Sequence, residues 1–270
     1  MEIVSGGVTD VGRVRTNNED SYKILEGLNL YVLSDGMGGE AHGEVASGLA
    51  VDTVVKYCSE AKADSGVTLV GTAPDHFGEK TKRLQSAVQQ ANLNIYESAQ
   101  KNQAQRGMGA TVTTVWANDD RLSVAHVGDS RAYLLRMGNL QQLTSDHSLV
   151  AEQVRRGIIT PQQAEESEMQ SVLLRALGAH PEVEVDVDEV GIYPGDILLI
   201  CSDGLSRMVT EPEIAGTLQA ETRPVEAAQK LVDLANERGG LDNVTVIVVR
   251  FQEKAKQWFS WLWRGRAKKD

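Results

Sequence analysis

The 270-residue sequence has little cysteine, proline or aromatic content, with two cysteines, six prolines and 5% aromatic residues. Cys58 and Cys201 lie far apart among apolar neighbours. They therefore form no zinc or redox motif and predict buried thiols in a reducing compartment. No apolar run approaches the ~20 residues that cross a bilayer, and the first residues lack the pattern of a signal peptide. We expect a cytoplasmic globular protein of one large or two small domains.

Positive charge is also scarce, since 27 basic residues face 38 acidic ones and the net charge is −11. This balance excludes a generic nucleic-acid binder, which needs a basic face for the phosphate backbone. The charge is unevenly placed. Residues 253–270 carry six basic and two acidic side chains, hence +4, which leaves −15 on residues 1–252. We expect one domain over 1–252 followed by a basic tail.

The tail over 253–270 also holds three of the four tryptophans. On a helical projection its apolar residues cover one broad face: Trp258, Phe259, Trp261, Leu262 and Trp263. Three interpretations stay open. The tail is an interfacial helix on a membrane surface, a segment that contacts the acidic body or a partner, or a segment that is disordered in isolation.

Short segments rich in β-branched residues predict strands at 28–33, 110–117, 122–127, 132–136, 183–190, 196–201 and 244–251. Short links predict antiparallel hairpins between the second and third of these segments and between the third and fourth. Three amphipathic stretches, at about 46–61, 80–103 and 225–237, predict helices. Hairpins with separate helices favour an α+β fold.

Residues 146–180 are polar and contain Gly157 and Pro161. Their pattern predicts short helices over 148–156, 161–166 and 170–177, inserted between two strands. Such an insert is either a flap beside a functional site or an inert surface insertion, and the sequence pattern leaves both open.

Aspartates recur at the ends of predicted strands. Asp35, Asp129 and Asp203 each follow an apolar strand and a small residue, and Asp242 leads into the last strand. A single Asp in such a place is usually a turn or capping residue, but four suggest convergence. Clustered carboxylates need a cation, and oxygen-only ligands favour Mg²⁺ or Mn²⁺. Two such ions would hold a bridging hydroxide for attack on phosphorus.

Two further patterns carry weaker signals. Arg15 and Asp20 share one segment, in which a guanidinium suits a phosphate dianion and a carboxylate suits proton transfer, although a surface loop would look the same. The G-x-G-x-x-A pattern at 36–41 is found in dinucleotide-binding folds. We disfavour that interpretation because Asp35 would face the pyrophosphate and the rest of the chain is rich in hairpins.

Together these residues resemble a known set, and seven motifs carry the resemblance in the same order. They are Arg15 to Asp20, Asp35-Gly36-Met37-Gly38-Gly39, Gly109-Ala110-Thr111, Val127-Gly128-Asp129-Ser130-Arg131, Asp146-His147-Ser148, Cys201-Ser202-Asp203-Gly204 and Asp242-Asn243. The chain is similar to the metal-dependent protein phosphatases of type 2C, bacterial branch, from about residue 3 to 251. The resemblance implies a four-layer α-β-β-α sandwich of two antiparallel sheets flanked by helices, with a small helical flap at about 146–180.

The resemblance also implies the chemistry. Phosphoserine and phosphothreonine in proteins would be hydrolysed without a phosphoenzyme, with two or three Mn²⁺ or Mg²⁺ ions. Asp35 would bridge two ions, the Gly36 carbonyl would bind one, and Asp203 and Asp242 would bind the other. Asp129 with Asp203 would hold a third, weaker ion.

In the same comparison, Arg15 would hold the substrate phosphate and Asp20 would hydrogen-bond to metal-bound water. The chain departs from the family where a histidine acts as general acid, because it has Met37 and Glu40 at those places. His42 lies close enough to substitute, or it is a solvent-exposed residue at the start of a helix. The general acid therefore stays unassigned.

The expected partners are phosphoproteins and a cognate kinase of the eukaryotic-like Ser/Thr type, with no nucleic acid, and we expect a monomer. The location is cytoplasmic, with or without peripheral membrane contact through 253–270. Two alternatives remain: a pseudophosphatase that binds phosphoproteins without turnover, which the intact Asp35, Asp203, Asp242 and Arg15 disfavour, and a two-metal nuclease or phosphodiesterase, which the acidic body disfavours.

Overall fold

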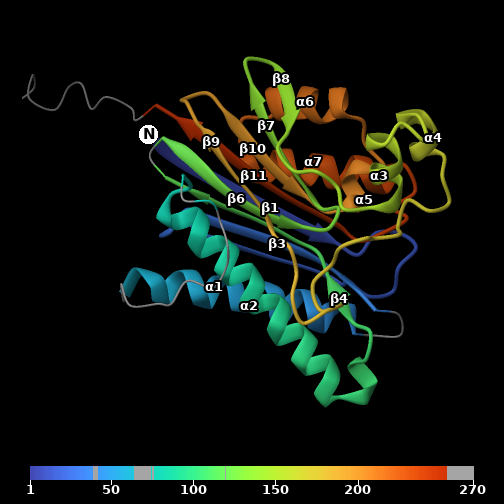
Figure 1. Cartoon of the computed structure of the whole chain (residues 1–270). Coiled ribbons are helices and arrows are strands. Elements are labelled where there is room, and N and C mark those ends of the chain that lie inside the picture. Colours follow the sequence, from blue (N-terminus) through green and yellow to red (C-terminus); the bar gives the residue numbers. More distant parts are fainter. Residues whose placement is uncertain (39–41, 64–73, 75, 119, 254–270) are drawn as a thin grey trace, which may run out of the picture.

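A computed structural model of the chain describes residues 1–38, 42–63, 74, 76–118 and 120–253. Two antiparallel sheets lie face to face and helices cover their outer faces, which gives four layers (Figure 1). The predicted α+β sandwich is therefore confirmed. The tail from residue 254 onward lies outside the described residues, so its three interpretations remain predictions.

All neighbouring strands in the two sheets run antiparallel. The first sheet has the strand order β1 (Glu2–Asp10), β11 (Val244–Gln252), β10 (Ile197–Cys201), β7 (Arg131–Arg136) and β8 (Asn139–Gln142). The second has the order β2 (Asp20–Leu25), β3 (Leu30–Met37), β5 (Val112–Ala117), β6 (Arg121–Val127) and β9 (Asp186–Gly191), and the short β4 (Gly109–Ala110) pairs with β3.

The central strands are buried along most of their length because both of their faces are covered. In β3, Leu30 and Val32 pack toward the helices, whereas Tyr31 and Leu33 face the other sheet. Successive strand residues point to opposite faces, so burial on both sides removes the polar alternation of a half-exposed strand. Strands β1, β2 and β8, which the sequence analysis missed, are more exposed and lack such runs.

Two pairs of helices cover the sheets. Helices α1 (Gly43–Ala63) and α2 (Glu79–Lys101) pack on the second sheet, and a 3₁₀ turn, η1 (Gln103–Gln105), follows. Helices α6 (Glu211–Ala220) and α7 (Pro224–Glu237) pack on the first. Within the described ranges, no helix is long and apolar enough to span a membrane.

One predicted hairpin is wrong. Strands β6 and β7 are joined by only 128–130, yet they lie in different sheets: β6 pairs with β5 and β9, and β7 pairs with β10 and β8. Gly128 turns the chain with a φ of +114°, a conformation that favours glycine. This crossing carries Asp129 to the place where the two sheets meet.

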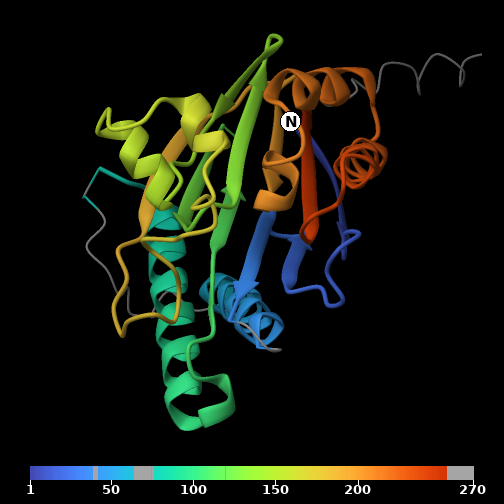
Figure 2. The ribbon, with the colours of Figure 1, turned by 90° about the vertical axis from the view of Figure 1, so that its right-hand side faces the viewer.

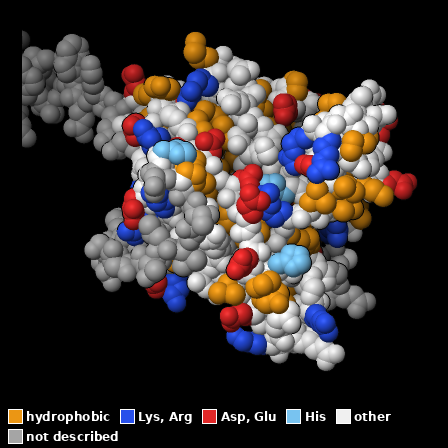
Figure 3. All heavy atoms as spheres, viewed as in Figure 1, with side chains coloured by type: hydrophobic (Ala, Val, Ile, Leu, Met, Phe, Trp, Pro, Cys, Tyr) orange, Lys and Arg blue, Asp and Glu red, His pale blue; other side chains and the backbone are white. Residues whose placement is uncertain are grey.

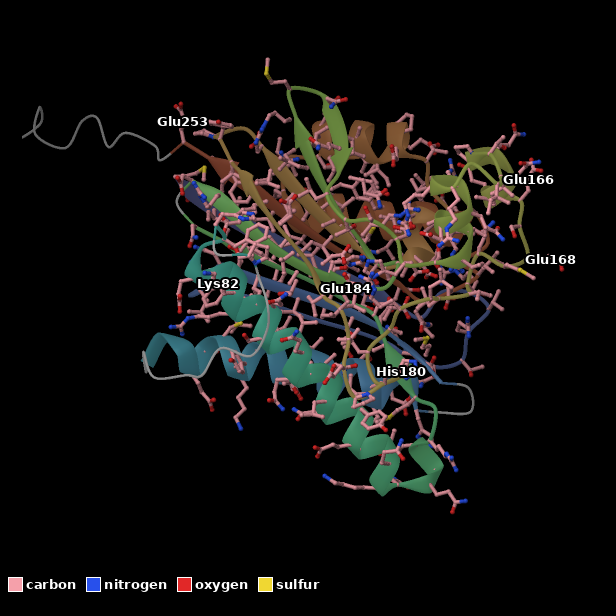
Figure 4. The ribbon with its side chains drawn as sticks, in the orientation of Figure 1. Lys82, Glu166, Glu168, His180, Glu184 and Glu253 are labelled. Atoms are coloured by element: carbon pink, nitrogen blue, oxygen red, sulfur yellow. The ribbon has the colours of Figure 1, made fainter. Side chains whose placement is uncertain are left out.

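The insert at 146–180 contains two short helices, α3 (Leu149–Arg155) and α4 (Pro161–Glu165). In Figure 2 they lie apart from α6 and α7, and in Figure 4 Glu166 and Glu168 mark the outer end of the insert. The predicted helix over 170–177 is wrong. That segment is irregular because its backbone pairs with other segments, through the bridges Ser148–Leu173 and Ala110–Leu177.

Candidate active site

Four predicted site residues lie at strand ends where the two sheets meet. Asp20 begins β2 and Asp35 lies directly opposite it in β3. Asp203 follows β10 and opens the short helix α5 (Asp203–Ser206), and Asp242 precedes β11. The second sheet thus supplies two carboxylates and the first sheet supplies the other two.

Asp20 joins the two sheets. Its Oδ2 accepts hydrogen bonds from Ser202 Oγ at 2.8 Å and from Thr245 Oγ1 at 2.6 Å, and both donors belong to the first sheet's side of the site. Its other oxygen, Oδ1, is buried without a hydrogen-bond partner. The carboxyl is therefore fixed in orientation with one oxygen free.

The backbone around Asp35 is held from both sides. Thr111 donates its backbone N–H to the Asp35 carbonyl at 2.8 Å, and the Asp35 N–H donates to Thr111 Oγ1 at 3.0 Å. At Gly36, a Cβ would lie 2.0 Å from the Gly43 carbonyl oxygen, so no other residue fits. The close packing of β3 against the start of α1 explains the glycine that follows Asp35.

Asp129 sits on the crossing between the sheets, and His147 holds that crossing. The Gly128 N–H donates to His147 Nδ1 at 3.0 Å, and the His147 N–H donates to the Gly128 carbonyl at 2.8 Å. His147 Nε2 in turn lies 3.1 Å from Asp186 Oδ2. Asp129 is thereby placed near Asp203, where its Oδ2 lies 3.4 Å from Arg207.

The loop that carries Arg15 is anchored by Asn243. Asn243 Nδ2 donates to the carbonyls of Val11 and Asn17, both at 2.9 Å, and its Oδ1 accepts the Glu19 N–H at 2.8 Å. The Arg15 side chain is 52% exposed and donates to Asp242 Oδ2 at 2.9 Å. The guanidinium thus stands at the open side of the acidic cluster.

His42 lies just before α1, half-buried, and its carbonyl accepts the Ala46 N–H. Glu40 lies outside the described residues. The general acid therefore stays unassigned, as the sequence left it.

The clustered carboxyls have raised pKa values. Burial first, and the neighbouring Asp203 and Asp242 next, raise the pKa of Asp20 to about 7 against the hydrogen bonds from Thr245 and Ser202. Burial also raises the pKa of Asp129 to about 7, and the pKa of Asp35 lies well above its ordinary value through burial and then Asp20. Burial and like charge both disfavour the ionised form.

These residues fit divalent cations by charge and donor type. The buried oxygens Asp20 Oδ1 and Asp203 Oδ1 have no hydrogen-bond partner, and carboxylate and carbonyl oxygens suit Mg²⁺ and Mn²⁺. Among the described residues, however, no group of three or more Asp, Glu, His or Cys side chains could hold an ion by itself. The arginines explain part of this, because Arg15 binds Asp242 and Arg207 binds Asp203.

Sequence reasoning missed the residues that position these carboxyls: Thr111, His147, Ser202, Thr245 and Arg207. Thr111, His147 and Ser202 lie within the motifs quoted above, beside the acidic residues, so the motifs gave a signal that the analysis did not use. Arg207 had another signal, since it stands four residues after Asp203 on a helical turn.

Comparisons with known proteins agree with one another. The sequence model described as Protein phosphatase 2C matches residues 12–237. The protein phosphatase PhpP of Streptococcus pneumoniae is 36% identical over 250 residues, covering 92% of this chain and 97% of PhpP. The crystal structure of the Mycobacterium tuberculosis serine/threonine phosphatase PstP/Ppp superposes with a TM-score of 0.81 at 37% identity, covering 93% of this chain and 99% of that chain. A similar structure, the catalytic domain of PstP in complex with two manganese ions, has a TM-score of 0.78 at 37% identity, with the same coverage.

Proposed function

This chain belongs to the protein phosphatase 2C family, and from that premise we propose how its acidic cluster acts. It is a protein-serine/threonine phosphatase that uses Mn²⁺ or Mg²⁺. The observation that carries the proposal is the convergence of Asp20, Asp35, Asp203 and Asp242 from two sheets. Burial raises the pKa values of Asp20, Asp35 and Asp203, and one carboxyl oxygen each of Asp20 and Asp203 is buried without a partner. We interpret this cluster as a cation site in which Arg15 and Arg207 pair with Asp242 and Asp203.

We assign two ions to this cluster. Asp35 would contact both, the Gly36 carbonyl would bind one, and Asp203 and Asp242 would bind the other. When bound, the ions would supply a hydroxide nucleophile for attack on phosphorus and would neutralise the phosphoryl oxygens. The binding of Asp203 and Asp242 requires that Arg207 and Arg15 share or release these carboxylates.

Two side chains have separate roles in the proposal. Arg15, released from Asp242, would bind the phosphate of phosphoserine or phosphothreonine with its guanidinium fork. Asp20 would accept a proton at its free Oδ1, since Ser202 and Thr245 occupy Oδ2. A carboxylate fixed in orientation with one free oxygen suits the acceptance of a proton.

The insert at 146–180 is the proposed contact for the protein part of the substrate. Its outer surface exposes apolar side chains: Ile158, Met169, Val172 and Leu174. Apolar and basic side chains gather over α3 and α4 in Figure 3. We assign residues 1–252 to the phosphatase domain, which would act as a cytoplasmic monomer and reverse a Ser/Thr kinase of the eukaryotic-like type.

The direct test is hydrolysis of a phosphothreonine peptide and of p-nitrophenyl phosphate with and without Mn²⁺. We expect turnover that needs Mn²⁺ and is lost in EDTA. Asp203→Ala removes a ligand and should lower turnover at least roughly 10²-fold, because each lost transition-state contact of this kind costs several kcal/mol. Asp120→Ala is the matched control, because Asp120 is exposed and directly precedes β6. A wild type without metal-dependent turnover would indicate a pseudophosphatase, and full activity in Asp203→Ala would contradict the site.

The basic tail over 253–270 would contact a membrane surface or a partner. Comparing the full chain with a 1–252 truncation in co-sedimentation with anionic liposomes distinguishes these. A membrane role predicts that only the full chain sediments and that salt weakens its binding. Equal sedimentation of both proteins would exclude the membrane role and leave contact with the acidic body or a partner, or a tail that is disordered in isolation.

A further inference from the structure

Arg207 lies between two buried carboxylates of the site. One of its terminal nitrogens is 2.5 Å from Asp203 Oδ2 and 3.4 Å from Asp129 Oδ2. The side chains of Asp203 and Asp129 are only 11% and 9% exposed. These are the two residues that the family resemblance assigns to a third, weaker metal ion. In this chain a guanidinium stands there.

The backbone keeps Arg207 in this place. Arg207 ends α5, and its N–H donates to the Asp203 carbonyl at 2.9 Å. Residues four apart share one face of a helical turn, so the side chain starts beside Asp203. The same nitrogen also approaches the Gln170 carbonyl of the insert at 3.4 Å. Arg207 therefore has three acceptors from three different segments.

Arg15 provides a contrast within the same site. Its side chain is 52% exposed and has a single carboxylate partner, Asp242, at 2.9 Å. Arg207 is 24% exposed and contacts two carboxylates. An exposed arginine on a loop can turn toward a substrate phosphate, whereas a largely buried arginine beside two acids acts as their counter-ion.

We propose that Arg207 is a built-in cation that fills the position between Asp129 and Asp203, so that this chain binds two divalent ions and excludes a third. The proposal rests on the two-ion site assigned above. A third ion held by both Asp129 and Asp203 would have to displace the guanidinium from between them, which is unfavourable. The ion assigned to Asp203 and Asp242 needs only that Arg207 share Asp203, because Asp129 remains its partner. The Arg207 side chain then links the insert to the site through the Gln170 carbonyl. This link does not depend on the free metal concentration.

Calorimetric titration of the metal-free full chain with Mn²⁺ tests this proposal, because it counts the bound ions and measures their affinities. Wild type should bind two ions. Arg207→Gln should bind a third, at least roughly ten-fold more tightly than any third ion in wild type, because one charge within a few ångströms is worth that factor at moderate dielectric. Arg207→Lys keeps the charge and should bind two. Arg156→Gln is the matched control: Arg156 lies in the insert at 146–180 and pairs with Glu152 rather than with an aspartate of the cluster.

The double variant Arg207→Gln/Asp129→Asn locates the new ion, since it should return the stoichiometry to two. Two ions in both wild type and Arg207→Gln would contradict this proposal alone, as would a third ion of equal affinity in both. A gain in affinity for a third ion that is as large in Arg207→Lys as in Arg207→Gln would also overturn the proposal. A wild type that binds no Mn²⁺ would instead contradict the proposed function, and with it this inference.

Discussion

Replacing Asp35 by asparagine should lower metal-dependent turnover roughly 10³-fold or more and, in the same protein, stabilise the metal-free fold. The loss follows from the proposed contact of Asp35 with both ions, because a lost metal contribution of about 4 kcal/mol corresponds to 10³ in rate. The gain in stability of the metal-free fold follows from the environment of Asp35. Burial and four neighbouring aspartates, Asp20 first, raise the pKa of Asp35 well above its ordinary value. Asparagine has the shape of the protonated carboxyl and no charge to accommodate.

The measurement is kcat on a phosphopeptide in Mn²⁺ together with urea unfolding in EDTA at pH 7.5. Asp52→Asn, at an exposed position on α1, is the control and should change neither quantity. A variant that loses activity and also stability would show that Asp35 supports the fold, which contradicts its assignment as a ligand held at a cost in stability.

The stabilisation by Mn²⁺ should increase steeply with pH. A carboxyl with a raised folded pKa binds a proton that the unfolded chain has released, so its stabilising effect is present below the ordinary pKa and is lost as pH rises through the folded value. For Asp20, with a pKa of about 7 against 3.8, the loss is on the order of 4 kcal/mol. The metal-free protein should therefore weaken between pH 4 and 7. Mn²⁺ replaces these protons, so the gain from Mn²⁺ should be larger at pH 7.5 than at pH 5 by about 3 kcal/mol or more.

His126 titrates in the opposite direction. Burial first, and then His147, lower the pKa of His126 from 6.5 to about 4, so its neutral form stabilises the fold above pH 6.5 and that stability is lost as pH falls toward 4. The effect is the same with and without Mn²⁺ and cancels in the difference. Urea midpoints in Mn²⁺ and in EDTA at both pH values give that difference. An equal Mn²⁺ gain at pH 5 and 7.5 would count against the proton-metal exchange.

Local patterns were enough to predict the α+β class and the acidic residues, whereas the four layers were implied by the family resemblance. Apolar runs such as 244–251 match β11, and the stripe at 225–237 matches α7 to within one residue. The aspartates were found because the same context, an apolar strand and a small residue followed by Asp, recurs along the chain. Each of these patterns is formed by residues that are close together in the sequence, so the sequence alone reveals it.

Sequence patterns could not predict which distant segments meet. The short link at 128–130 favoured a hairpin, and only the pairing of β7 with β10 shows that the chain changes sheets there. Likewise, Thr245 reads as an ordinary strand residue until its hydroxyl is placed 2.6 Å from Asp20, 225 residues earlier. Arg207 could not be assigned either, because its second carboxylate, Asp129, is 78 residues away in the sequence.

The pairing of β1 with β11 sets the time at which activity can begin. The strand at Glu2–Asp10 completes its sheet only against Val244–Gln252, and Asp242 and Thr245 lie at the same end of the chain. During synthesis, which proceeds from the N-terminus, β1 has no sheet partner and the proposed cation site lacks Asp242 until residues 242–252 have been made. We therefore expect activity only after β11 has joined β1.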